Sequence, residues 1–379
     1  MSGEKRINLL VIPDLFPKFE GDVQGIFVLD YLKSVEAYCN ITVLVVRLSG
    51  DKKGLTIEKK DGYTLYRYFL SDKKVSIFLK PFYYVSWFSK GYSAGKKLVE
   101  TDIIHSHGTI LGGTLSLLLS RKFKKPFIIT EHQGPFSMIS GSFWKRNWAR
   151  YIMQKAQMVL TVSDHLKQEI LSSNIHPKKI EVTYNPVDTK LFGLRPLIST
   201  KNILYVGRLD NFKGAFRSLK AFEKITDQFP EWKFTVVGDG EDYLPIKRYL
   251  EERPELQKKV FLEGKRSKVE IASEMQKADF FVFPSRHESF GLVVAEALSS
   301  GLSVITGDET GPKEFVGPSS GILVPADDIE AIAVAMKKMI STLNSYDPGA
   351  IRQEIVDRFS FENFGKKLAG IYRTLLNKQ

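Results

Sequence analysis

The 379-residue chain has a single cysteine, Cys39, and no apolar run long enough to span a membrane. One cysteine excludes an internal disulfide framework. The longest apolar candidate, residues 110–119, is shorter than the roughly 18 residues that a spanning helix requires and contains two glycines. The apolar stretch that begins at Ile7 is interrupted at once by Pro13 and Asp14, which is typical of a core strand and not of a signal peptide. We therefore expect a cytoplasmic protein.

Motifs for phosphate-bearing cofactors are also missing. The sequence holds no Walker motif, and residues 237–240, Val-Gly-Asp-Gly, lack the third glycine of the dinucleotide-binding fingerprint. Residues 317–321 match Gly-x-Ser-x-Gly, but a strand-like segment follows them where a nucleophile elbow requires a helix. These observations argue against NAD, ATP and serine-hydrolase chemistry, and we expect no cofactor.

The chain does carry an excess of positive charge, with a formal net charge of +12. This charge suits nucleotide diphosphates, nucleic acid or an anionic membrane face, and does not choose among them. The apolar content of 43% and the charged content of 26% are ordinary for a soluble globular protein. At this length the chain is expected to form two domains, each with its own core.

Short apolar runs alternate with segments of helical spacing, which predicts an α/β fold of parallel sheets covered on both faces. The alternation pauses at Asn185-Pro186-Val187-Asp188 and restarts at Ile203, so we expect two Rossmann-like, doubly wound domains, residues 1–190 and 191–359. Ligands of such sheets bind beyond the carboxyl ends of the strands, and two facing sheets would form a deep cleft. The predicted strands are 7–12, 41–46, 103–105, 127–130, 158–162, 202–206, 233–237, 260–262, 280–283 and 303–305, and the predicted helices include 216–225 and 292–298.

Residues 280–301 read as a buried strand, a polar loop and a helix. The loop places Glu288 at the expected cleft, and the amides of Phe290, Gly291 and Leu292 would form a helix N-terminus suited to a phosphate. Glu296 lies on an otherwise apolar helix, where a carboxylate needs partners such as the hydroxyls of a ribose. The alternative is that Glu288 caps the helix and Glu296 forms an ordinary surface pair.

Two further groups of residues follow strands. Arg208 and Lys213 lie on one short loop, where two cations and backbone amides suit a diphosphate; the alternative is a solvated basic loop. His105 and His107 share one face of a strand, and with His132 they form either a metal site or a hydrogen-bonded group at the strand ends.

These segments, taken in order, resemble the group 4 (group 1 in older naming) retaining glycosyltransferases, a family with the GT-B fold of two Rossmann-like domains facing across a deep cleft. The central match is Glu288 and Glu296, which resemble the family's Glu-x7-Glu element. Other matching segments span nearly the whole chain: 7–13, 16–17, 25–28, 102–108, 130–132, 162–163, 185–188, 206–209, 213–214, 237–240 and 311–314.

The resemblance implies a hexosyltransferase-type enzyme that takes its sugar from a nucleotide-diphosphate donor, with UDP or GDP as the expected nucleotide. On the family pattern Glu288 faces the donor sugar, Glu296 binds the ribose, and Arg208 and Lys213 bind the diphosphate. The pattern also makes His107 a contact of the donor sugar. The sequence lacks the Asp-x-Asp motif of the metal-dependent GT-A enzymes, so no metal is expected.

The same resemblance assigns several loops and the last helix. The loop after Gly264 would lie near the base, and Gly21 and Gly25 would belong to a flexible glycine loop, although the common Gly-Gly pair is missing. The C-terminal segment 360–379 reads as an amphipathic helix with Ser360 as its cap, and would pack back on the N-terminal domain. The N-terminal domain would bind the acceptor and the C-terminal domain the donor.

Residues 73–97 contain six lysines, seven aromatic residues and no acid, and residues 143–155 repeat this composition. Cations among aromatics suit the headgroup layer of an anionic membrane and would fit a lipid-linked acceptor. The alternatives are that the aromatics pack inward or that the stretch binds nucleic acid. No nucleic-acid motif is present, so no nucleic-acid partner is expected.

The expected function is sugar transfer to a saccharide or lipid-linked acceptor, in the biosynthesis of a cell-surface polysaccharide or glycolipid. Two other readings stay open. One is a GT-B enzyme that epimerises a nucleotide sugar or phosphorolyses a sugar, and the other is a non-catalytic protein that binds a saccharide or nucleotide sugar.

Overall fold

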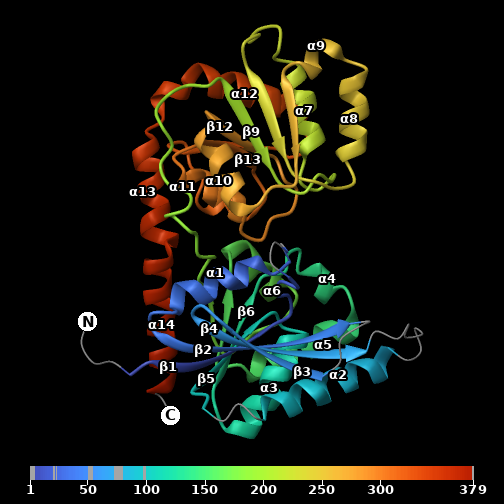
Figure 1. Ribbon diagram of the computed structural model, residues 1–379, viewed down its shortest axis with the longest axis vertical. Coiled ribbons are helices and arrows are strands. Elements are labelled where there is room, and N and C mark those ends of the chain that lie inside the picture. The colour runs from blue at the N-terminus through green and yellow to red at the C-terminus, as the bar shows by residue number, and fades with distance from the viewer. Residues whose placement is uncertain are drawn as a thin grey trace. The chain divides into compact units, whose positions relative to one another are not determined.

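The computed structural model describes residues 5–19, 22, 24–49, 54–71, 80–96 and 100–377, without the side chains of 48–49, 70–71, 80–86 and 88. The chain forms two compact α/β units. Unit 1 comprises residues 1–186 and 361–379, and unit 2 comprises residues 187–360 (Figure 1). Each unit is built on its own sheet, which confirms the predicted pair of doubly wound α/β domains.

Unit 1 contains an eight-stranded sheet in the order β3-β4-β2-β1-β5-β6-β7-β8. Neighbouring strands are parallel except β3 and β4, which form an antiparallel pair at one edge that the sequence pattern did not predict. The strands are β1 (Ile7–Pro13), β2 (Cys39–Ser49), β3 (Gly54–Lys60), β4 (Tyr63–Ser71), β5 (Ile103–His107), β6 (Phe127–Glu131), β7 (Met158–Thr161) and β8 (Ile180–Val182).

The last helix of the chain, α14 (Phe361–Leu376), belongs to unit 1 and runs beside α1 (Ile26–Val35) (Figure 1). Its residues Phe364, Leu368 and Tyr372 are buried in the same core cluster as Val28 of α1. The other helices of unit 1 are α2 (Lys80–Gly95), α3 (Leu111–Phe123), α4 (Ser137–Ser140), α5 (Phe143–Lys155) and α6 (Asp164–Ser172).

Unit 2 contains a six-stranded, fully parallel sheet in the order β11-β10-β9-β12-β13-β14. Its strands are β9 (Asn202–Val206), β10 (Lys233–Val237), β11 (Val260–Gly264), β12 (Phe280–Phe283), β13 (Ser303–Gly307) and β14 (Gly321–Val324). All residues of the central strands β9 and β12 are buried, because helices cover both faces of the sheet.

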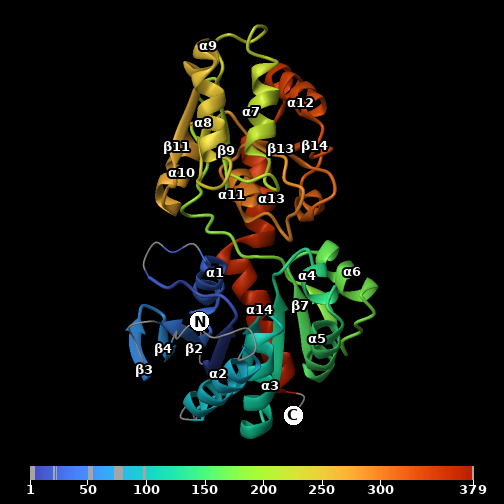
Figure 2. The ribbon, with the colours of Figure 1, turned by 90° about the vertical axis from the view of Figure 1, so that its right-hand side faces the viewer.

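Figure 2 shows α7 (Ala215–Glu223) and α12 (Ile329–Thr342) side by side over this sheet. The remaining helical elements of unit 2 are α8 (Tyr243–Glu251), α9 (Pro254–Gln257), α10 (Lys268–Gln276), α11 (Leu292–Ser299), η2 (Gly311–Glu314), η3 (Leu343–Ser345) and α13 (Pro348–Phe359). None of the helices in the described part of the chain has both the length and the apolar character that a bilayer crossing requires.

Candidate active site

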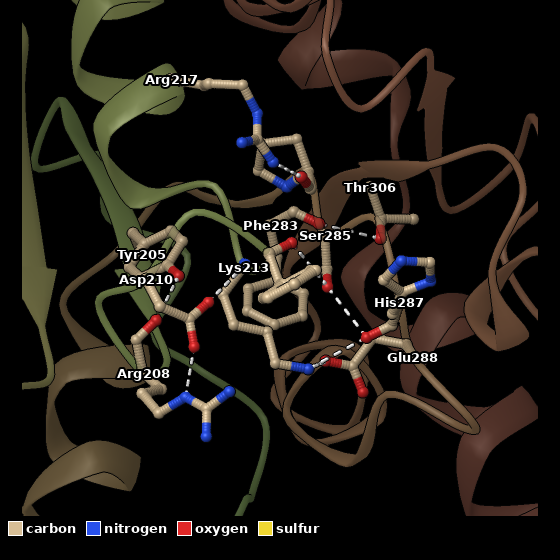
Figure 3. A network of polar contacts seen from close by, with 12 residues as sticks. Tyr205, Arg208, Asp210, Lys213, Arg217, Phe283, Ser285, His287, Glu288 and Thr306 are labelled. Carbon is tan, nitrogen blue, oxygen red and sulfur yellow. Dashed lines mark hydrogen bonds and ion pairs between the residues drawn. The ribbon is translucent and has the colours of Figure 1, made fainter. Parts of the chain in front are cut away.

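The loops that follow β9 and β12 meet at the carboxyl end of the sheet in unit 2, and they bring Lys213 and Glu288 together (Figure 3). The Lys213 ammonium forms an ion pair with Oε1 of Glu288 and donates to the carbonyl of His287 at 3.0 Å. The Lys213 side chain is 22% exposed and that of Glu288 16%, so the pair is screened from most of the solvent and still reachable from it. Two residues that lie 75 positions apart thus form one charged centre.

Arg208 lies on the same loop as Lys213 and is held at its base by Asp210. The Nε atom of Arg208 pairs with one oxygen of the buried Asp210 carboxylate, and the other oxygen accepts the Lys213 amide at 2.9 Å. The Arg208 side chain remains 67% exposed, and Figure 3 shows the end of its guanidinium pointing away from Asp210. Asp210, which the sequence analysis did not single out, therefore orients both predicted cations.

The loop after β12 is fixed by hydrogen bonds to its neighbours. Arg217 donates to the carbonyls of Pro284 at 3.1 Å and Ala326 at 2.7 Å, and Ser285 donates to the His287 carbonyl at 3.1 Å. The Glu288 carbonyl in turn accepts the Gly311 amide at 2.9 Å. Because the backbone on both sides of Glu288 is tied down, its carboxylate has a defined place.

The helix that follows, α11, begins as the sequence predicts. Gly291 is its N-terminal flanking residue with φ of 82°, a left-handed conformation that favours glycine. Leu292 is the first helical residue, and the ring of Phe290 is buried against Phe315 and Phe359. Phe290 therefore contributes packing by its side chain, while the amides of this turn form a helix N-terminus.

Glu296 lies on the second turn of α11 and is buried, with 7% of its surface exposed. Lys268, the first residue of α10, places its ammonium 3.6 Å from the Glu296 carboxylate. The sequence reasoning predicted that this carboxylate needs partners but did not identify Lys268. Gly264 ends β11, and its carbonyl accepts the amide of Gly238 at 2.9 Å, so this loop too starts from the carboxyl end of the sheet.

The other predicted residues belong to unit 1. His107 is the last residue of β5 and is buried; its Nδ1 atom lies 2.9 Å from Nε2 of His132. His105 stacks on His107 with ring centroids 4.4 Å apart, and its Nδ1 atom lies 2.7 Å from the Tyr372 hydroxyl of α14. Burial lowers the pKa of His107 to about 3, and burial also lowers the pKa values of His105 and His132. All three rings are neutral at pH 7.

Two carboxyl groups, those of the half-buried Asp14 and the buried Glu131, lie at the same sheet end of unit 1 and were missed by the sequence reasoning. Asp14 follows β1 and accepts the Gly112 amide at 2.5 Å, while Glu131 ends β6 and accepts the Thr109 hydroxyl at 2.5 Å. Burial raises the pKa of Asp14 to about 7 and also raises that of Glu131. A signal was present in the sequence, because Glu131 directly follows the predicted strand 127–130 and Asp14 lies two residues after the predicted strand 7–12.

Gly25 precedes α1 with φ of 75°, and a Cβ atom there would lie 2.5 Å from the carbonyl carbon of Leu15. The backbone of this loop thus packs closely on the end of β1. Gly21 lies outside the described residues. Among the residues that are described, no group of three or more His, Cys, Asp and Glu side chains is arranged to hold a metal ion.

The predicted cationic and aromatic stretch 73–97 is only partly covered by the structure. Residues 73–79 and 97 lie outside the described residues, as do the side chains of 80–86 and 88. Trp87 is buried, and its indole donates to the Val46 carbonyl at 3.2 Å. Lys90 and Lys96 are exposed. For Trp87 the inward-packing alternative is therefore the one observed.

Comparison with known proteins identifies the class. The model of the family "Glycosyltransferase Family 4" matches residues 39–191, and that of "Glycosyl transferases group 1" matches residues 197–347. The Anabaena protein HepE in complex with UDP is 15% identical and superposes with a TM-score of 0.74 over 97% of this chain and 100% of that one. This likeness shows the two-domain GT-B fold of glycosyltransferases.

The chain belongs to the group 1 glycosyl transferases, also called glycosyltransferase family 4, and is a glycosyltransferase. A glycosyltransferase of Methanocaldococcus jannaschii is 27% identical over 78% of this chain and 83% of its own length. The GDP-mannose:cellobiosyl-diphosphopolyprenol alpha-mannosyltransferase of Xanthomonas campestris is 27% identical over 65% of this chain and 66% of that enzyme.

Proposed function

We propose that the protein is a retaining, metal-independent glycosyltransferase that moves a sugar from a UDP or GDP sugar to a saccharide or lipid-linked acceptor. The observation that carries this proposal is the group formed by Arg208, Lys213 and Glu288 at the carboxyl end of the sheet in unit 2. Ligands of doubly wound sheets bind at this end. Two cations beside one carboxylate suit a donor that carries a diphosphate on one side of the breaking bond and a sugar on the other.

Each residue has a separate task in this proposal. An ammonium has three N–H donors, and Glu288 and the His287 carbonyl take two of those of Lys213, so the third can reach a phosphate oxygen. The exposed guanidinium of Arg208 binds the diphosphate as its charge grows in the transition state. Glu296, whose charge Lys268 balances, binds the ribose, and the loop after Gly264 lies near the base.

The reaction on this assignment needs no metal and no cofactor. The acceptor hydroxyl attacks the anomeric carbon on the face from which the diphosphate leaves, and the leaving phosphate takes its proton. Glu288 positions the sugar ring and lends negative charge to the oxocarbenium-like state, and the neutral imidazole of His107 contacts the same sugar. Unit 1 binds the acceptor, with Gly25 in a loop near the donor.

The acceptor class follows from less direct observations. The net positive charge of the chain and the substrate of the Xanthomonas relative, a diphosphopolyprenol-linked saccharide, both favour an acceptor that carries a lipid. The protein would then work in the cytoplasm at the inner face of the membrane, in the biosynthesis of a cell-surface polysaccharide or glycolipid.

The test begins with thermal shifts in the presence of UDP, GDP and ADP sugars. The proposal expects one UDP or GDP sugar to stabilise the protein and to be consumed in excess EDTA when short saccharides or isoprenyl-diphosphate saccharides are added. NMR of the product should show the anomeric configuration of the donor. Stabilisation by none of the sugars would contradict the donor assignment.

The same assay separates the two rival readings. An epimerase would release a new nucleotide sugar without any acceptor, and a phosphorylase would require inorganic phosphate in place of a nucleotide. A binding protein would be stabilised by a nucleotide sugar and would turn over no acceptor.

A further inference from the structure

Helix α5 of unit 1 carries exposed aromatic side chains on the side that faces away from the core of the unit. One side of the helix buries Ala149, Ile152 and Met153. Phe143 is 61% exposed and Trp144 80%. The outward residues, with Met138 of the preceding helix α4, form what we term the α5 face: Met138, Phe143, Trp144, Trp148 and Tyr151, all exposed. Large apolar side chains gathered in this way on a surface mark an interaction site.

The aromatic rings of this face hold one another in place. Phe143 and Trp144 meet edge to face at 5.5 Å, and Trp148 stacks on Tyr151 at 5.6 Å. The indole of Trp148 donates to Thr114 of α3 at 2.9 Å. Ile110, Trp144, Lys145, Asn147 and Trp148 line a hollow of about 490 Å³. The face is thus preorganised.

Positive charge surrounds the α5 face. Between residues 110 and 157 the sequence contains a single acid, Glu131, whose side chain is buried. The same segment contains eight cations on and around α3 and α5, two helices that pack side by side (Figure 1): Arg121, Lys122, Lys124, Lys125, Lys145, Arg146, Arg150 and Lys155. Three of the cations contact the aromatics. Arg121 donates to the Tyr151 hydroxyl at 2.8 Å, the Lys155 ammonium lies 5.6 Å from the Tyr151 ring centroid, and the Arg146 guanidinium carbon lies 6.0 Å from the Phe143 ring centroid.

We propose that the α5 face docks unit 1 onto an anionic lipid bilayer, with Phe143 and Trp144 entering the headgroup layer and the surrounding cations binding lipid phosphates. Tryptophan favours the membrane interface because its ring is apolar and its N–H is polar. Cations close to an anionic membrane each contribute about 1 kcal/mol of attraction. A nucleic acid could bind the same cations, but it offers no hydrocarbon layer in which the exposed side chains of Phe143 and Trp144 could be buried.

The proposed function places the enzyme at the inner face of the membrane, and docking by the α5 face would make that contact. It also has a consequence for the site. Ile110, which lines the hollow, is separated from His107 by only two residues, and α3 begins directly after it. Docking by the α5 face would therefore hold the β5 end of the sheet in unit 1 close to the lipid surface.

The test is co-sedimentation with vesicles of phosphatidylcholine, either pure or with about 30 mol% phosphatidylglycerol, a fraction chosen to give a strongly anionic surface. The full chain should pellet with the anionic vesicles and stay in solution with the neutral ones. The variant Phe143→Ser/Trp144→Ser should bind the anionic vesicles at least tenfold more weakly. Its matched control, Leu244→Ser/Val334→Ser, replaces two similarly exposed apolar residues of unit 2 and should bind within twofold of the unchanged protein.

A second pair of variants isolates charge. Lys122→Glu/Lys145→Glu should lose binding about tenfold or more, since each cation contributes about 1 kcal/mol. Lys247→Glu/Arg248→Glu on α8, which makes the same change in net charge, should leave binding unaltered. Thermal melts equal to that of the unchanged protein would show that each variant is folded.

Tryptophan fluorescence reports insertion directly. Brominated lipids should quench the unchanged protein and should quench Trp144→Phe markedly less. The proposal would be overturned if Phe143→Ser/Trp144→Ser bound anionic vesicles as tightly as the unchanged protein. It would also be overturned if the protein bound duplex DNA but not vesicles, or if it formed a dimer that the same variant abolishes. None of these readouts depends on sugar transfer, so a failure here leaves the proposed function standing.

Discussion

Lys213 and Glu288 neutralise each other in a site where neither charge is well solvated. Removing one member of such a pair leaves the other without its counter-ion in a partly desolvated position, which is unfavourable by more than the pair itself contributes. The amide of glutamine keeps the shape and the hydrogen-bonding oxygen of Glu288 and removes only the negative charge. Glutamine at this position therefore tests the charge with little disturbance of the fold.

The first prediction separates the tasks of the two glutamates. Glu288→Gln should lower the rate of transfer at least 100-fold, because the negative charge beside the sugar is lost, while the Kd for the nucleotide changes less than threefold. Glu296→Ala should raise that Kd about tenfold or more and leave the rate at saturating donor within a few-fold. Calorimetry with UDP and GDP and single-turnover assays measure the two effects.

The reverse outcome, in which Glu288→Gln loses nucleotide binding and Glu296→Ala loses only rate, would refute this division. Lys268→Gln provides a matched control for Glu296. It removes the charge partner and keeps the carboxylate, so it should also act on binding and not on rate.

At this scale the sequence identified residues better than it identified contacts. Glu288, Lys213 and Arg208 stand out because each follows a buried strand in a polar loop. The pairing of Lys213 with Glu288 depends on the order of strands in the sheet, where β9 and β12 are neighbours although six elements, α7, β10, α8, α9, β11 and α10, lie between them along the chain. Lys268 and Asp210 were missed for a similar reason, because their roles are visible only once their partners are placed.

At the scale of elements, the packing of α14 on α1 depends on one small residue. A Cβ atom on Gly365 would lie 1.8 Å from the Ser34 carbonyl oxygen, so the two helices approach closely at this point. The same helix carries Tyr372, whose hydroxyl contacts His105 of β5. The seating of α14 is therefore linked to the histidines of unit 1.

The second prediction uses the two glycines of α14. Gly365→Ala should destabilise unit 1 by about 2 kcal/mol, since the added methyl has to push α14 away from α1. Gly370→Ala, on the same helix with nothing within 4 Å of the added atom, should be neutral or stabilising by up to about 1 kcal/mol because alanine is the better helix former. Urea unfolding of both variants measures the difference, and equal effects would contradict the close approach.

The sequence predicted most strands of both sheets, because buried parallel strands are continuous apolar runs. It did not predict the hairpin of β3 and β4, whose outer strand β3 has no buried residue and ends in the three charged residues 58–60. It did not predict β8 either, a strand of three partly buried residues at the opposite edge. Edge strands bury little, so their apolar signal is weak.

At the scale of the whole molecule, buried titratable groups make the stability of unit 1 depend on pH. Unit 1 buries His105, His107 and His132 as neutral rings, with pKa values below the ordinary 6.5. Groups with a lowered pKa in the folded state stabilise the fold above pH 6.5, and this contribution is lost as the pH falls toward the folded pKa, about 3 for His107.

The buried carboxyl groups of unit 1 act in the opposite direction. Burial raises the pKa of Asp14 from 3.8 to about 7 and raises that of Glu131 above 4.5. Their contribution to stability is complete below the unfolded pKa values and is lost as the pH rises through the folded ones. Between pH 6 and 4.5 the three histidines bind protons in the unfolded chain and not in the folded unit. At most two protons are bound by the two carboxyl groups in the folded unit and not in the unfolded chain. The unfolded chain therefore binds about one more proton than the folded unit over this range.

The third prediction is therefore that unit 1 loses stability on acidification, by about 1.4 kcal/mol per pH unit over this range. In a Trp232→Phe variant all remaining tryptophans lie in unit 1, so their fluorescence in urea follows this unit alone. The midpoint should fall between pH 6 and pH 4.5. Adding His107→Gln should flatten this dependence, because the unfolded chain then binds one histidine proton fewer. A urea midpoint that rises on acidification would contradict the prediction, since it would mean that the protons bound by the folded carboxyl groups outnumber those bound by the unfolded histidines.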